Sequence, residues 1–259
     1  MVKRKRKQRI FAKGFAVLTV LLLLAALLLQ ARYKEQKRLE EVAAYLPPAT
    51  VWEPDNLPVY EGRPFGEINA NMPFFTEEEK QAGEFEYYAE LDSRGRCVLA
   101  YANIGQELMP VSPREDISMV KPSGWQYARY DFIEDGILYN RCHLIGFQLT
   151  GENANERNLI TGTRYLNVEG MLPFENRVDD YIETTGNHVL YRVTPIYDGT
   201  NQVASGVLME AWSVEDKGKG ICFNVYCYNV QPGVVIDYSD GSNYADEKSI
   251  KHIAVPNTN

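Results

Sequence analysis

The sequence predicts an α+β protein in which an antiparallel β-sheet with few helices is preceded by a transmembrane helix. Three runs rich in β-branched residues alternate in polarity and are separated by Gly and Asp, which favours an antiparallel meander. These runs cover residues 189–197, 203–212 and 221–230. A stretch of helical composition, Arg164 to Thr185, comes before them and ends at Gly186, a typical helix C-cap.

The N-terminus predicts a membrane anchor. Residues 1–14 carry seven positive charges and no negative charge, and residues 15–31 form an uncharged apolar run. Because basic residues flank the cytoplasmic end of a span, we expect a cytoplasmic tail, a single transmembrane signal anchor and an extracellular remainder. The alternative is a signal peptide cleaved near Ala31, which would release a secreted protein. Leu29 is a poor small residue for a cleavage site, so the sequence favours the anchor.

The rest of the chain divides by composition into three parts. Residues 32–58 are charged and then interrupted by four prolines, which indicates a juxtamembrane linker. Residues 59–240 are expected to form the folded domain, and residues 241–259 a polar C-terminal tail.

Local signals place the first elements of this domain. Strand-like runs occur around Ile68 and over residues 97–103. Between them, Thr76 followed by Glu79 is a capping-box pattern. Residues 109–126 contain three prolines and predict a loop.

Charge limits the modes of binding. The net charge is −8, and beyond residue 14 the chain has 20 basic against 35 acidic residues. A polyanion would therefore need a local basic strip or a bridging metal ion. The four cysteines match no zinc template, and their pairing stays open.

The centre of the chain gathers polar residues around one histidine. Two aromatic or aliphatic runs flank Glu134-Asp135-Gly136 and predict a β-hairpin over residues 127–142, with His143 at the end of its second strand. A loop rich in asparagine follows, and then the helix that carries Asn167 and Glu175. Eight residues apart on a continuous helix, these two lie within about 80° of each other.

These residue types suit one chemistry. A neutral imidazole such as that of His143 can take a proton from water. The amide oxygen of Asn167 is a hard ligand suited to a hydrated Mg²⁺ ion, and Arg141 could neutralise charge that develops on a phosphate. Signatures of a P-loop and of a serine-hydrolase elbow are missing. The combination indicates metal-assisted hydrolysis of a phosphodiester.

The run Asn140-Arg141-Cys142-His143, with the later RNLITGTRYLN, resembles the DNA/RNA non-specific endonucleases of the ββα-metal type, which include membrane-anchored bacterial DNA-entry nucleases. Their signature is Asp-Arg-Gly-His, followed by a metal-binding Asn. The resemblance covers roughly residues 60–238 and implies a ββα-metal finger, a Mg²⁺ or Mn²⁺ cofactor and DNA and RNA as substrates. It assigns His143 as the general base, Arg141 as the signature arginine, Asn158 as a supporting polar residue, Glu175 as a carboxylate near the water shell of the metal, and Asn167 as the metal ligand.

Two signature positions depart from the pattern. Asn140 replaces an aspartate, and Cys142 replaces a glycine, so a positive φ there would be strained. The substrate-side arginine of the family has two candidates, Arg114 and Arg129. We expect the other two histidines, His188 and His252, to have no catalytic role, and the many tyrosines to pack the sheet rather than stack on bases.

The sequence therefore predicts a membrane-anchored extracellular endonuclease that cleaves DNA and RNA with little sequence preference. The alternative is a surface module that keeps the nuclease fold, has weakened catalysis and binds nucleic acid or a protein partner. For single residues, simpler structural roles stand beside the catalytic ones: Glu175, for example, could pair with Arg177 or Arg164 on the helix surface.

Overall fold

The computed structural model describes residues 19, 21, 23–30, 32–34, 37 and 57–247. The chain divides into two compact units, Met1–Pro47 and Pro48–Asn259. In the first unit, the described residues are helical. The cytoplasmic tail and most of the linker lie outside the described residues, and so does part of the predicted transmembrane segment, residues 15–31. Within the described part of the chain, no helix has both the length and the apolar character needed to cross a bilayer.

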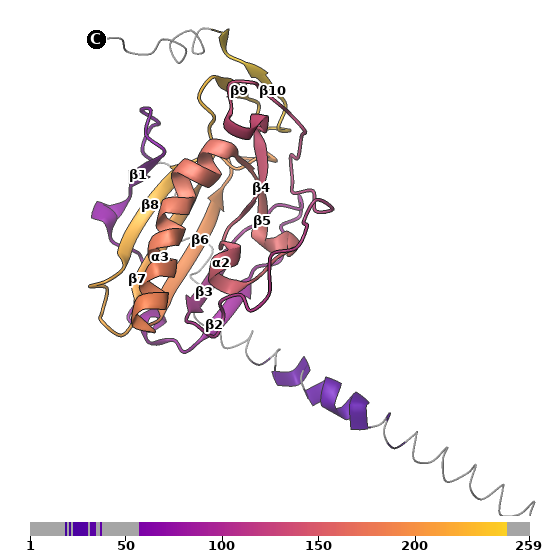
Figure 1. The fold of residues 1–259 in the computed structure, drawn as a ribbon, viewed down its shortest axis with the longest axis vertical. Helices are drawn as coiled ribbons and strands as arrows, with labels where there is room; N and C mark the ends of the chain where they lie inside the picture. The colour runs from indigo at the N-terminus through magenta and orange to yellow at the C-terminus, as the bar shows by residue number, and fades with distance from the viewer. Residues whose placement is uncertain are drawn as a thin grey trace, which may run out of the picture. The chain divides into compact units, whose positions relative to one another are not determined.

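The second unit is built on a six-stranded antiparallel sheet with the strand order β1-β8-β7-β6-β3-β2 (Figure 1). The strands are β1 (Phe65–Glu67), β2 (Phe85–Tyr88), β3 (Ala100–Ile104), β6 (Val189–Ile196), β7 (Gly206–Ser213) and β8 (Cys222–Tyr228). Strands β6, β7 and β8 form the meander expected from their alternating polarity, and that prediction is confirmed.

The helix predicted over residues 164–185 covers one face of this sheet (Figure 1). It begins as a π-helix, η6 (Leu166–Met171), and continues as the α-helix α3 (Leu172–Thr185). Pro173 lies in the first turn of α3, directly after the π-helical stretch. Gly186 ends the helix with φ of 68°, as the C-cap signal predicted. Phe174, Val178 and Ile182 of α3 are buried in the main core with the inward side chains of the sheet.

The other face of the sheet carries a buried charge cluster. Arg192 on β6 donates to Glu210 Oε2 at 2.7 Å and to Glu79 Oε1 at 2.9 Å. Glu79 belongs to the 3-10 helix η3 (Glu79–Gln81), and the predicted capping box is confirmed. Thr76 N donates to Glu79 Oε2 at 2.6 Å, and Glu79 N donates to Thr76 Oγ1 at 3.1 Å. The charged side chains are thereby paired, as burial requires.

A separate two-stranded sheet carries His143. Strand β4 (Tyr139–His143) pairs antiparallel with β5 (Leu159–Thr163), and η6 and α3 follow, which completes a ββα unit. The hairpin predicted over residues 127–142 is wrong. Its two halves share a single bridge, Arg129 with Ile137, and the turn forms the 3-10 helix η4 (Glu134–Gly136). The first half is largely exposed, whereas β5 offers β4 a fully buried strand to pair with.

The remaining elements are short. Between β4 and β5 lie the α-helix α2 (Phe147–Thr150) and the 3-10 helix η5 (Glu156–Asn158), and η2 (Asn69–Asn71) follows β1. Near the C-terminus, β9 (Val234–Ile236) pairs with β10 (Asn243–Ala245), so the stretch predicted as a polar tail includes one strand. The described cysteines are all free thiols.

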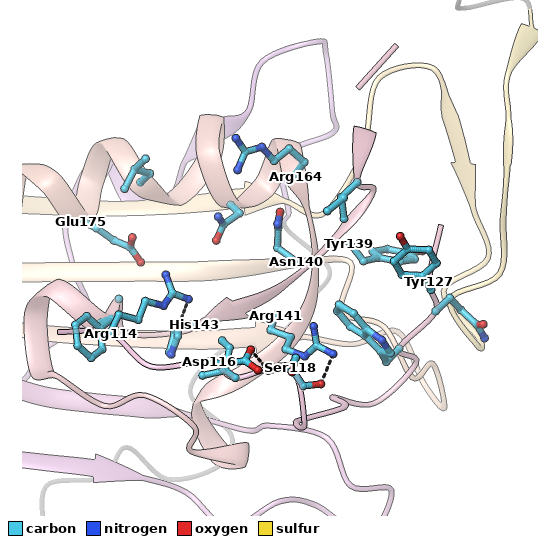
Figure 2. Close-up of a pocket in the computed structure, with 18 of the residues that line it drawn as sticks. Arg114, Asp116, Ser118, Tyr127, Tyr139, Asn140, Arg141, His143, Arg164 and Glu175 are labelled. Carbon is cyan, nitrogen blue, oxygen red and sulfur yellow. Dashed lines mark hydrogen bonds between the residues drawn. The ribbon is translucent and has the colours of Figure 1, made fainter. Parts of the chain in front are cut away.

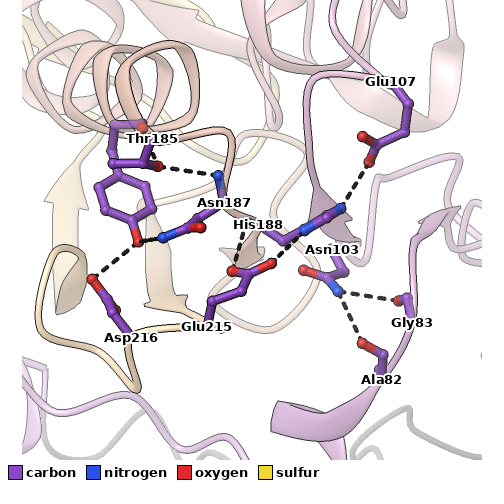
Figure 3. A network of polar contacts seen from close by, with 10 residues as sticks. Ala82, Gly83, Asn103, Glu107, Thr185, Asn187, His188, Glu215 and Asp216 are labelled. Atoms are coloured by element: carbon purple, nitrogen blue, oxygen red, sulfur yellow. Dashed lines mark hydrogen bonds and ion pairs between the residues drawn. The ribbon is translucent and has the colours of Figure 1, made fainter.

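His188 precedes β6 and joins three loops at one end of the sheet (Figure 3). Its Nδ1 lies 2.6 Å from Glu215 Oε1, and its Nε2 lies 3.2 Å from Glu107 Oε1. An imidazolium ring carries an N–H on each nitrogen, so the arrangement suits a protonated His188 that pairs with both carboxylates.

Candidate active site

A pocket of about 620 Å³ opens where β4, the 114–128 loop and the start of α3 meet (Figure 2). Among its lining residues are four that the sequence singled out: Arg141, His143, Asn167 and Glu175. The ββα unit explains this convergence, because β4 ends at His143 while η6 and α3 bring the other two polar side chains to the same place.

His143 is held as a neutral imidazole. Only 6% of the residue is exposed, and its Nε2 lies 2.8 Å from the carbonyl oxygen of Asn153. A carbonyl can only accept, so Nε2 carries the hydrogen and Nδ1 keeps its lone pair. Arg114 Nη2 lies 3.5 Å from that Nδ1. Burial lowers the pKa of His143 to about 4, so the imidazole is uncharged at neutral pH.

Two oxygen donors line the same pocket. Glu175 is 7% exposed, and Gln148 Nε2 donates to its Oε2 atom at 3.4 Å. Burial raises the pKa of Glu175 to about 7. The Oδ1 atom of Asn167 accepts from the thiol of Cys142 at 3.1 Å. Two hard oxygens with weak protein partners fit a divalent cation, which would relieve the buried carboxylate of its desolvation.

The donor set favours an ion that keeps most of its water. In the described part of the chain, no group of three His, Cys, Asp or Glu side chains is placed to hold a metal. Mg²⁺ needs few protein ligands because it gives up its water reluctantly. The residues present therefore fit a largely hydrated Mg²⁺ better than a structural zinc ion.

Of the three arginines that line the pocket, Arg141 and Arg114 have different partners. The guanidinium of Arg141 donates to the carbonyl oxygens of Val120 at 2.5 Å and Ser118 at 2.6 Å. It also lies 4.1 Å from the ring centroid of Trp125. Arg141 thus fixes the 118–125 loop as a wall of the pocket. Arg114 reaches His143 instead, whereas Arg129 is not part of the lining.

Asn158 lies behind the pocket rather than in its lining. It is fully buried, accepts from Ile145 N at 2.9 Å and donates to Ile145 O at 3.0 Å. This pair of bonds fixes the backbone that connects His143 to Gly146, which does line the pocket. Asn158 therefore contacts the pocket only indirectly, through the backbone of Ile145.

The two departures from the family signature are accommodated. Cys142 sits in β4 with ordinary extended backbone, so the strain expected for a non-glycine residue does not arise. Its side chain fills space beside Gly162, where an added Cβ would lie 2.6 Å from Cys142 Cβ. Asn140 lines the pocket, and its buried Oδ1 has no hydrogen-bond partner.

Sequence reasoning missed several lining residues, Gln148 and Trp125 among them, and left Arg114 ambiguous. Gln148 and Trp125 carried no signal beyond their nearness to the central stretch. Arg114 was one of two equal candidates, because a loop of 18 residues rich in proline gives no periodicity from which to read a position.

Comparisons with known proteins agree with this fold. The profile of the DNA/RNA non-specific endonuclease family matches residues 76–215. NucA from Streptococcus agalactiae, in a crystal structure with a magnesium ion bound, is 25% identical with a TM-score of 0.64, over 74% of this chain and 91% of NucA. The Sda1 nuclease, in a structure with a bound zinc ion, is 29% identical with a TM-score of 0.54, over 62% of this chain and 82% of Sda1.

A solved structure described as an extracellular endonuclease shares the fold at 21% identity and a TM-score of 0.51, over 72% of this chain and 100% of that one. A search of curated protein sequences gave no match. Since the family profile covers more than half of the residues, including β4, β5 and α3, the chain belongs to the DNA/RNA non-specific endonuclease family.

Proposed function

We propose that this protein is a membrane-anchored extracellular endonuclease that hydrolyses phosphodiester bonds of DNA and RNA, with His143 as general base and one hydrated Mg²⁺ or Mn²⁺ ion. The observation that carries the proposal is the placement of His143: its Nε2 lies 2.8 Å from the Asn153 carbonyl, which leaves Nδ1 unprotonated in the same pocket as Asn167 and Glu175.

The proposed reaction begins with a water molecule beside Nδ1 of His143. The imidazole takes a proton from this water as its oxygen attacks phosphorus, and the bond from phosphorus to the leaving oxygen breaks. Arg114, next to His143, donates to the phosphate as negative charge builds on its oxygens. Asn167 would bind the metal ion directly, and Glu175 would bind it through the water molecules of the ion. When bound, the ion would stabilise the negative charge on the phosphate and on the leaving oxygen.

Local charge supports a polyanionic substrate despite the acidic chain. The charged residues that line the pocket are three arginines, Arg114, Arg141 and Arg164, and two acids, Asp116 and Glu175. A bound divalent ion would add to this positive excess. Since Arg164 also pairs with Asp135 at 2.8 Å, Arg114, Arg141 and the bridging ion would together offset the overall charge of −8.

Two further points support the finer parts of the proposal. NucA, similar in fold and 25% identical, was solved with magnesium, and an all-oxygen donor set suits the same ion here. The basic cluster before the apolar run of residues 15–31 supports anchoring with the folded unit outside the cell.

The test uses the full-length chain, purified in mild detergent, with plasmid DNA and with RNA in the presence of Mg²⁺ or EDTA. We expect cleavage of both substrates with Mg²⁺, none with EDTA, and none by His143→Ala, whose fold is checked by circular dichroism. Plasmid that is retarded but intact in every lane would support the alternative of a binding module with weakened catalysis.

A further inference from the structure

The pocket extends beyond the residues used for hydrolysis. Figure 2 shows His143, Arg114 and Glu175 toward one end, Tyr127 at the other, and Arg141 between them. Trp125 also lines the pocket. The proposed chemistry uses only the first end, so the aromatic end of the pocket, defined by Trp125 and Tyr127, has no role in that chemistry.

Trp125 is held in a fixed orientation. Its ring packs on the guanidinium of Arg141 at 4.1 Å, and two backbone carbonyls, those of Ser118 and Val120, hold that guanidinium in turn. Trp125 also packs against a small apolar cluster that includes Leu138. Because this cation and these apolar side chains hold the Trp125 ring in place, the ring makes a rigid wall for a planar ligand.

Packing does not account for Tyr127. The residue is 73% exposed and belongs to none of the described core clusters. Its hydroxyl has one long contact, with Arg129 Nη1 at 3.5 Å. Because Tyr127 is one of the residues that line the pocket, a ligand bound there would cover part of this exposed ring.

The chemistry of both ends together selects the ligand. The arginines Arg114 and Arg141 favour an anion, and two aromatic rings favour a planar π-system attached to it. A nucleotide unit has both parts. Bases within a duplex are already stacked on their neighbours, so only an unpaired base can reach these rings.

We propose that the aromatic end of the pocket binds an unpaired nucleobase next to the phosphate that is cleaved, so that the enzyme acts preferentially on single-stranded segments. The inference rests on the proposed function only in taking nucleic acid as the substrate. It revises the expectation from sequence that the tyrosines serve packing alone, for this one residue.

The test compares the loss of the ring with the loss of the base. The full-length chain with His143→Ala, which keeps substrates intact, is titrated in EDTA with a fluorescein-labelled single-stranded trinucleotide and with the same trinucleotide lacking its central base. Tyr127→Ala should weaken binding of the intact trinucleotide about five- to tenfold, at the lower end of values for base–aromatic stacking, and should leave binding of the abasic one unchanged. Tyr127→Phe, the matched control, keeps the ring and should bind within about twofold of the parent.

Other outcomes decide against the idea. Equal weakening for both trinucleotides would mean that the ring contacts sugar or phosphate, and no weakening, or no binding at all, would overturn the inference. A second measurement uses the active chain: Tyr127→Ala should lower the ratio of kcat/KM for single-stranded over duplex DNA by a similar factor. The binding titrations use an inactive variant, so the two proposals can fail separately. If the titrations give the expected result but the active chain does not cleave, only the proposed hydrolysis is refuted. If the chain cleaves normally but the titrations do not give the expected result, only this inference is refuted.

Discussion

Replacing Asn158 with alanine tests how the site is supported from behind. The amide of Asn158 makes two hydrogen bonds to the backbone of Ile145, at 2.9 and 3.0 Å, and both residues are fully buried. Asn158→Ala removes both partners at once. The N–H and C=O of Ile145 are then left in the core without hydrogen bonds.

The expected loss of stability follows from those two groups. An unsatisfied buried donor or acceptor lowers stability by about 1–3 kcal/mol, and water entering the small void would recover part of this. We therefore expect a loss of about 3 kcal/mol in the free energy of unfolding, which lowers Tm by roughly 6–12 °C for a domain of this size. Because Ile145 connects His143 to Gly146, we also expect kcat/KM to fall at temperatures where the variant is still folded.

The measurement is chemical denaturation and thermal melting followed by circular dichroism, with Asn153→Ala as the matched control. Asn153 lies in the same loop, but its buried side-chain oxygen has no partner, and the backbone carbonyl that holds His143 survives the substitution. This control should change stability by less than about 0.5 kcal/mol. If the two variants were equally stable, the assignment of Asn158 to backbone support would be refuted.

Three further predictions concern individual groups. Cys142→Ala removes the donor to Asn167 Oδ1 and should weaken Mg²⁺ binding about three- to tenfold in a titration of activity against metal, while Cys142→Ser keeps a donor and should retain most of the affinity. Burial raises the pKa of Glu175 to about 7, so protons compete with the cation and Mg²⁺ affinity measured by calorimetry should fall as the pH drops below 7; an unchanged pH dependence in Glu175→Gln would contradict this. Partial burial lowers the pKa of His188, but the hydrogen bond and charge of Glu215 raise it, and the net shift is upward. The stability that the His188 ion pair contributes is therefore full below pH 6.5 and is lost as the pH rises through the folded pKa. His188→Gln should therefore flatten the fall in Tm from about pH 6 to about pH 8, and an equally steep fall in the variant would refute the role of this ion pair.

The local pattern of the chain was enough to predict several elements. Alternation with a period of two marks β6, β7 and β8, because successive side chains point to opposite faces of the sheet: one face packs against α3, and the other carries polar residues such as Arg192 and Glu210. Gly186 ends α3 because only a residue that tolerates positive φ fits there, and Thr76 with Glu79 forms the predicted capping box. These features depend on neighbours within a few residues, so they are legible in the sequence. The same holds for the order of groups around His143, whose spacing carries the family resemblance.

Long-range packing decided the rest of the site. The sequence offered Arg141 as the signature arginine and Arg114 only as one of two candidates for a second one, but the fold engages Arg141 with loop carbonyls and Trp125 and sets Arg114 beside His143. Likewise, β4 pairs with β5 and not with the nearer run before Gly136. Partners many residues away compete for each strand edge and each guanidinium, and burial and hydrogen bonding across the whole domain select among them. The sequence by itself thus determined which chemical groups are available, while only the tertiary structure decided which of them face the pocket.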